Sequence, residues 1–133
     1  MRTWTVEGKE DSFTETCDWF HDRSHVVCNS ETVTPEKTSK GVSVFSWSAQ
    51  TGRYRYYHYG SSGVAAAMDV FLTAGGLMAT YEREVGKDLV REHVWMTPRP
   101  DGSFDFREDD SVNGGPWKTV AQIHYIEKRP RAK

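Results

Sequence analysis

The feature that most constrains the fold is the segment 13–33, FTETCDWFHDRSHVVCNSETV, which contains both cysteines of the chain. Two runs rich in β-branched and aromatic residues flank the polar tetrad 21–24, a pattern typical of a β-hairpin. If Asp22 and Arg23 form a two-residue turn, Cys17 lies opposite Cys28. Because side chains alternate along a strand, one face of this hairpin carries Phe13, Glu15, Cys17, Trp19, Val26, Cys28 and Ser30. The segment therefore predicts the start of an antiparallel sheet.

The rest of the chain repeats this pattern of alternating residues between short turns. Glycine, proline and small polar residues gather at the expected turns, for example at 61–63 and 98–102. The three alanines of 64–73 suggest a helix, but the short length and the flanking glycines favour a strand. The other expected strands are 1–8, 41–49, 53–60, 77–85, 88–97, the residues between the turn at 98–102 and a polar loop at 109–116, and 117–128.

The turn lengths also predict which residues lie opposite each other on neighbouring strands. The expected pairs are Ser43–His58, Phe45–Tyr56, Trp47–Tyr54, Met68–Tyr81, Val70–Ala79, Leu72–Leu77, Ala79–Val94, Leu77–Met96, Glu82–Arg91, Met96–Phe104 and Val94–Phe106. Most of these pairs belong to one continuous apolar face. Arg53 and Arg55 lie on the opposite face, and arginine is easily accommodated in water, so we expect the apolar face to point inward.

A meander of about ten strands with open edges invites aggregation, and closure of the sheet removes those edges. We therefore expect an all-β fold, an antiparallel up-and-down meander closed into a barrel in which the last strand pairs with the first. A chain of 133 residues is expected to form one domain, here 1–128. The basic residues 129–133 are expected to form a solvated tail.

The composition excludes several classes of partner. A net charge of -2 gives no positive field, so we expect no nucleic-acid partner. No apolar run is long enough to span a bilayer, and the N-terminus lacks the pattern of a secretory signal, so a cytoplasmic location is expected. Cysteines in that compartment normally stay reduced, so Cys17 and Cys28 are predicted to be adjacent free thiols that mild oxidation could link.

Several spaced motifs resemble a known group of proteins: WTVEG, CDWF, VVC, GVSVFSWSAQTGRYRYY, SSG and NGGPWKTV. Together they resemble a lipocalin-like, calycin-type family of small bacterial β-barrel proteins of unknown function. The resemblance covers nearly the whole chain and implies a barrel akin to lipocalins, fatty-acid-binding proteins and nitrobindin. The family has no motif of agreed catalytic role, so the resemblance transfers no functional residue.

Such a barrel is predicted to bind a small, largely apolar or aromatic molecule in its lumen, because aromatic walls with tyrosine hydroxyls suit flat or lipid-like ligands. The candidate ligand-binding residues are Trp19, Phe45, Trp47, Tyr54, Tyr56, His58, Met68, Tyr81, Glu92, Met96, Phe104 and Phe106. A filled barrel that acts through its surface, as an interaction module or a homodimer, is an alternative. No cofactor is expected, although the likeness to nitrobindin suggests haem bound through His58 as an alternative.

A second alternative is a cofactor-independent isomerase or cyclase. Glu92 lies on the apolar face, where a carboxylate could act in proton transfer, and His58 could act likewise if it points inward rather than into water at the rim. Glu82, Arg91 and Asp69 are expected to be surface charges. No metal site is expected, because none of the metal-ligand spacings occurs among His21, His25, His58, His93 and His124.

Overall fold

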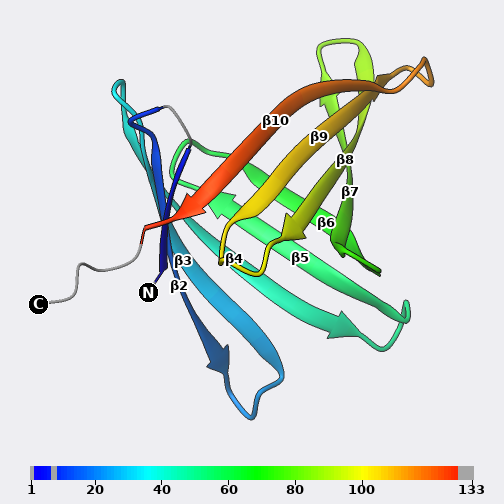
Figure 1. Cartoon of the computed structure of the whole chain (residues 1–133). Coiled ribbons are helices and arrows are strands. Elements are labelled where there is room, and N and C mark those ends of the chain that lie inside the picture. The colour runs from blue at the N-terminus through cyan, green and yellow to red at the C-terminus, as the bar shows by residue number, and fades with distance from the viewer. Residues whose placement is uncertain (1, 7–8, 129–133) are drawn as a thin grey trace, which may run out of the picture.

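The computed structural model describes residues 2–6 and 9–128, and this part of the chain forms a succession of β-strands joined by short turns (Figure 1). The strands are β1 (Arg2–Val6), β2 (Ser12–Phe20), β3 (His25–Val33), β4 (Thr38–Ser48), β5 (Arg53–Gly60), β6 (Ala65–Thr73), β7 (Gly76–Val85), β8 (Asp88–Pro98), β9 (Phe104–Val112) and β10 (Lys118–Glu127). No helix occurs in the described ranges, and the alanine-rich segment is the strand β6. The expected tail at 129–133 lies outside the described residues.

The strands close into a barrel. Each strand pairs with its neighbours in the chain, and β1 completes the ring by pairing with β10, with Trp4 opposite Glu127. Figure 1 follows this meander from β1 in blue to β10 in red, where the two end strands lie side by side. The predicted all-β meander closed into a barrel is therefore confirmed.

The predicted strand pairing is confirmed at four hairpins. Cys17 lies opposite Cys28 in β2 and β3, and Trp47 lies opposite Tyr54 in β4 and β5. The register between β6 and β7 and that between β7 and β8 also agree with the expected pairs. Short, symmetric turns account for this agreement, because they leave little freedom in how the two strands align.

The predicted register between β8 and β9 is wrong by two residues. Met96 lies opposite Phe106 rather than Phe104, and Val94 lies opposite Glu108 rather than Phe106. The cause is the turn between the two strands. It is closed by a hydrogen bond of 2.8 Å, which the N–H of Arg99 donates to the carbonyl of Ser103. A two-residue shift keeps every side chain on its predicted face but changes its partner.

The predicted polar loop at 109–116 is also wrong, because β9 continues to Val112 and only a short turn follows. Asn113 holds this turn to the start of β8. Its side-chain oxygen accepts from the N–H of Leu89 at 2.9 Å, and its amide nitrogen donates to Asp88 at 2.8 Å. Asp110 is thereby part of the sheet, on the same face as Glu92, which lies opposite it.

Candidate functional site

The inner face of the barrel is identified by a cluster of buried residues on adjacent strands, Val70, Ala79 and Val94. Phe45 and Tyr56 pack against this cluster, so the face of β4 and β5 that was expected to point inward does so. Strand alternation and pairing bring all the candidate ligand-binding residues to the same inner face, namely Trp19, Phe45, Trp47, Tyr54, Tyr56, His58, Met68, Tyr81, Glu92, Met96, Phe104 and Phe106. Their role in binding stays a prediction.

Aromatic side chains remain exposed at one end of the lumen, where the turns after β2, β4 and β6 lie. Trp19 is 62% exposed, Trp47 is 55% exposed and Tyr54 is 42% exposed. Trp47 and Tyr54 meet edge to face, with ring centroids 4.9 Å apart. We call these three residues the aromatic mouth. It presents apolar ring surface to the solvent at an opening of the barrel.

A hydrogen-bonded chain of neutral groups lies deeper in the lumen, on β4 and β5. The hydroxyl of Ser43, a residue only 2% exposed, lies 2.8 Å from the hydroxyl of Tyr56 and 2.9 Å from Nδ1 of His58. Burial lowers the pKa of His58 and raises the pKa of Tyr56. Both side chains are therefore neutral at pH 7, and His58 faces inward rather than lying at the rim in water.

Haem binding through His58 stays a prediction, and the structure describes how its imidazole ring is held. Its Nδ1 is engaged by Ser43, and its other ring edge lies over the backbone of Gly41 and Gly60. A Cβ atom placed on Gly41 would lie 2.6 Å from Cε1 and 3.3 Å from Nε2 of His58. Glycine at position 41 thus leaves room for the His58 ring against the barrel wall.

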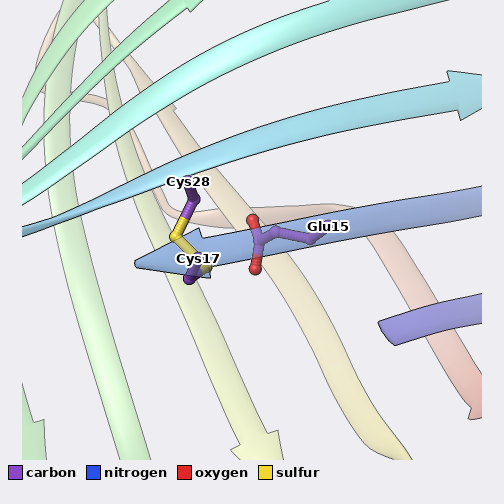
Figure 2. A group of neighbouring side chains, drawn as sticks. All are labelled: Glu15, Cys17 and Cys28. Carbon is purple, nitrogen blue, oxygen red and sulfur yellow. A yellow bond between two sulfur atoms is a disulfide. The ribbon is translucent and has the colours of Figure 1, made fainter. Parts of the chain in front are cut away.

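Cys17 and Cys28 form a disulfide across β2 and β3, with their Cα atoms 4.0 Å apart. The prediction that they are opposed is confirmed, whereas the prediction that they are free thiols is wrong. The physical reason lies in the strand pair, which places both side chains on one face close enough to join. Figure 2 shows the carboxylate of Glu15 beside the disulfide, directed towards it along β2.

A charged cluster lies on the inner face of β7, β8 and β9. Arg83 donates to Glu92 at 2.8 Å and to Asp110 at 3.4 Å, and Glu108 completes a group of three carboxylates within 4.8 Å of one another. Burial, the negative charge of Glu92 and a hydrogen bond with it raise the pKa of Glu108 to about 7. Burial and Glu92 also raise the pKa of Asp110. One guanidinium thus faces three acids, and a proton shared near Glu108 reduces their repulsion.

Sequence reasoning identified Glu92 but missed its partners Glu108 and Asp110. The wrong β8–β9 register placed Phe106 opposite Val94, and the wrong loop at 109–116 removed Asp110 from the sheet. The signal that could have found them is the alternation that continues past Phe106, with acidic residues at every second position up to Asp110.

The outer face carries ordinary surface pairs. Glu82 and Arg91 form an exposed salt bridge at 3.1 Å, and Asp69 is paired with Arg53 and Arg55. These groups were expected at the surface, and that prediction is confirmed.

Two open grooves also lie mainly over this face. One, of about 480 Å³, is bordered by residues that include Trp95, Asp105 and His124, and the other, of about 450 Å³, by residues that include Asp69, Arg91 and His93. Their charged groups are largely paired with each other.

No family model, no characterised protein and no solved structure matches the chain in the comparisons made. The closed antiparallel barrel is compatible with a lipocalin-like fold. Over the described ranges, no helix is long and apolar enough to cross a membrane.

Proposed function

We propose that the barrel binds a small, largely apolar or aromatic molecule in its lumen, as its lipocalin-like architecture suggests. The observation that carries this proposal is the aromatic mouth. Trp19, Trp47 and Tyr54 belong to the inward-facing set, yet each keeps more than a third of its surface exposed. Apolar surface left uncovered at an opening is where a ligand gains most by displacing water.

The packing of the inward-facing side chains supports the same proposal. The buried cluster around Val70, Ala79 and Val94 fills only part of the interior, and many inward-facing side chains, such as Tyr81 and Met68, are half-buried. This loose packing supports ligand binding over a filled barrel that acts only through its surface.

The side chains of the lumen wall also support a particular ligand chemistry. Phe45, Met68 and Met96 offer apolar surface, while the hydroxyl of Tyr56 and the neutral His58 offer hydrogen bonds beside it. A ligand with an apolar or aromatic body and one hydrogen-bonding group matches this wall.

A neutral fluorescent probe, N-phenyl-1-naphthylamine, tests the proposal. It is expected to bind with an increase in emission, and Trp47→Ala is expected to weaken binding about five- to ten-fold through loss of aromatic contact. Tyr59→Ala is the matched control, because Tyr59 is a comparably exposed aromatic residue on the opposite face of β5. No saturable binding, or an equal loss in both variants, would contradict the proposal. If Trp47→Ala abolished self-association instead, the result would favour the alternative of a filled barrel that acts through its surface.

A second candidate function is acid–base catalysis on the bound molecule, favoured by the pKa of Glu108 at about 7 beside Glu92. A carboxyl group that gains and loses its proton near neutral pH is suited to proton abstraction next to a carbonyl. The test is exchange of carbon-bound hydrogen for deuterium in a carbonyl compound that binds the lumen. Exchange that Glu108→Gln lowers at least 100-fold would support catalysis, and exchange that is unaffected would exclude this role.

A further inference from the structure

We propose that the Cys17–Cys28 disulfide is a thiol–disulfide exchange site open to the lumen, with Glu15 as its proton donor and acceptor and a low-molecular-weight thiol as its reductant. This inference does not depend on the ligand-binding proposal. It rests on three features of the inner face of β2 and β3: the pairing of the two strands, the unequal exposure of the two cysteine residues, and the position of the Glu15 carboxyl group.

Strand pairing makes the site reversible. β2 and β3 are joined along their whole length, from Ser12 opposite Val33 to Phe20 opposite His25. The backbone ladder therefore holds Cys17 and Cys28 opposite each other whether or not the sulfurs are bonded. Reduction leaves two adjacent thiols that need no large movement to close again.

The two cysteines differ in exposure, and this difference assigns their roles. Cys28 is only 5% exposed, next to the buried Ser43 on β4, whereas Cys17 is exposed. An incoming thiolate can reach the sulfur of Cys17, while the buried sulfur of Cys28 is suited to be the leaving group and later the resolving thiol.

Glu15 lies where it can donate a proton to the cysteine sulfurs and accept one from them. It lies on the same face of β2 as Cys17, and a carboxylate oxygen and both sulfurs lie within 4.8 Å of one another (Figure 2). Within the described part of the chain, the Glu15 side chain has no hydrogen bond or ion pair. Arg2 faces it from β1 but is bound to Glu127 at 2.8 Å. Burial raises the pKa of Glu15, which brings its protonated form closer to neutral pH.

The other titratable groups near the disulfide do not compete for this role. Tyr56 and His58 face the site from β5, and burial keeps both of them neutral at pH 7. The hydroxyl of Tyr56 and Nδ1 of His58 are already bonded to Ser43. Glu15 is thus the group that can exchange a proton with the sulfurs directly.

Reduction of the disulfide takes two thiol–disulfide exchange steps. A thiolate RS⁻ attacks the sulfur of Cys17, the Cys17–Cys28 bond breaks, and the Cys28 thiolate that leaves takes a proton from the Glu15 carboxyl group. Glu15 is reprotonated from solvent, which holds the protons that the two RSH molecules lose on forming RS⁻. A second thiolate attacks the external sulfur of the mixed disulfide and releases Cys17 as a thiolate, which takes its proton from the reprotonated Glu15. Two molecules of RSH are oxidised to RSSR, and the protein disulfide is reduced by two electrons to two thiols.

Glutathione and Glu15→Gln test the proton role. The rate of disulfide reduction is measured between pH 5 and pH 8 by alkylation of the new thiols and mass spectrometry. Glu15→Gln is expected to slow reduction and reoxidation at least ten-fold. Glu31→Gln is the matched control, because Glu31 lies on the opposite face of the same hairpin. Unchanged rates in a Glu15→Gln variant that unfolds at the wild-type denaturant concentration would overturn the proton role.

Single-cysteine variants test the assignment of the two sulfurs. In Cys28→Ser the remaining Cys17 is expected to react with glutathione disulfide at least ten-fold faster than the remaining Cys28 in Cys17→Ser. Peptide mapping of the wild-type mixed disulfide gives a second measurement that does not depend on the folding of these variants. Glutathione found on Cys28 rather than Cys17 would overturn the assignment.

Discussion

The inner face of the barrel carries two polar regions that differ in their chemistry. The first, on β2 to β5, holds the disulfide, Glu15 and the bonded set Ser43, Tyr56 and His58, and we call it the disulfide wall. The second, on β7 to β9, holds Arg83 with three carboxylates, and we call it the acidic wall.

The difference lies in how each wall satisfies its polar groups. The disulfide wall uses a covalent bond and hydrogen bonds between neutral groups, so it responds to the redox state. The acidic wall uses one guanidinium for three acids, and Oδ1 of Asp110 is buried without a hydrogen-bond partner among the residues that the structure describes. Its energy therefore depends on which carboxyl groups carry protons, so it responds to pH.

Removal of the disulfide is expected to have the largest effect on stability. The bond joins residues 11 positions apart, and a loop of this length predicts a loss of about 3 kcal/mol in the free energy of unfolding. The double variant Cys17→Ala, Cys28→Ala is compared with the oxidised wild type by urea denaturation. An unchanged midpoint would show that the backbone hydrogen bonds between β2 and β3 stabilise this wall without help from the disulfide.

Gly41→Ala probes the packing of the disulfide wall. The new Cβ atom would lie 2.6 Å from His58 and 2.9 Å from the hydroxyl of Ser30, so His58 must move away from Ser43. We expect a loss of about 1 to 3 kcal/mol in the free energy of unfolding. Gly75→Ala is the matched control, because no atom lies within 4 Å of a Cβ there. Equal effects of the two substitutions would mean that His58 does not pack on Gly41.

The acidic wall is expected to make stability fall with rising pH. The pKa of Glu108 is about 7 in the folded protein and lower in the unfolded chain, so the folded state binds more protons in this window. The contribution of Glu108 to the free energy of unfolding is therefore fully present below pH 4.5 and is lost as the pH rises through 7. Urea midpoints of wild type and Glu108→Gln are compared from pH 5 to pH 8. In the wild type, the free energy of unfolding is expected to fall by about 1 kcal/mol over this pH range, after allowance for solvent screening, and Glu108→Gln is expected to remove this fall.

Glu82→Gln is the control for this measurement, because Glu82 forms its ion pair with Arg91 on the exposed outer face. It is expected to leave the pH dependence unchanged. If Glu108→Gln kept the full decline, the shared proton would lie elsewhere and the contrast between the two walls would fail.

Trp19→Ala is expected to have the smallest effect, about 1 kcal/mol or less, because the side chain at the mouth end of the disulfide wall is 62% exposed. Chemical denaturation measures it. A loss of 3 kcal/mol or more would show that Trp19 packs into the wall and that the mouth is closed.

The disulfide wall could be predicted from the sequence in most of its geometry. Alternation assigned the faces, and the symmetric turn at 21–24 fixed Cys17 opposite Cys28. The oxidation state of that pair could not be predicted, because the geometry allows either thiols or a disulfide and the expected compartment favoured thiols. The inward position of His58 depends on Gly41, whose role emerges only once β4 and β5 are seen in contact with the ring.

The acidic wall could be predicted only in part. The face of Glu92 was correct, because a two-residue error in register preserves alternation. Its partners depended on the β8–β9 turn, where Asp101 accepts from the N–H of Ser103 at 2.9 Å and Gly102 adopts a positive φ of 88°. Such a longer turn has several possible closures, and the residue types alone do not choose among them.

Methyl NMR of labelled methionine tests the central claim, ligand binding in the lumen, most directly. Met68 and Met96 lie on the inner face, whereas Met78 lies on the outer face between Phe71 and Trp95. On titration with N-phenyl-1-naphthylamine, we expect saturable shifts of the Met68 and Met96 methyl signals and no shift of Met78. Shifts of Met78 alone, or no shift of the two inner methyl groups at saturating probe, would contradict it.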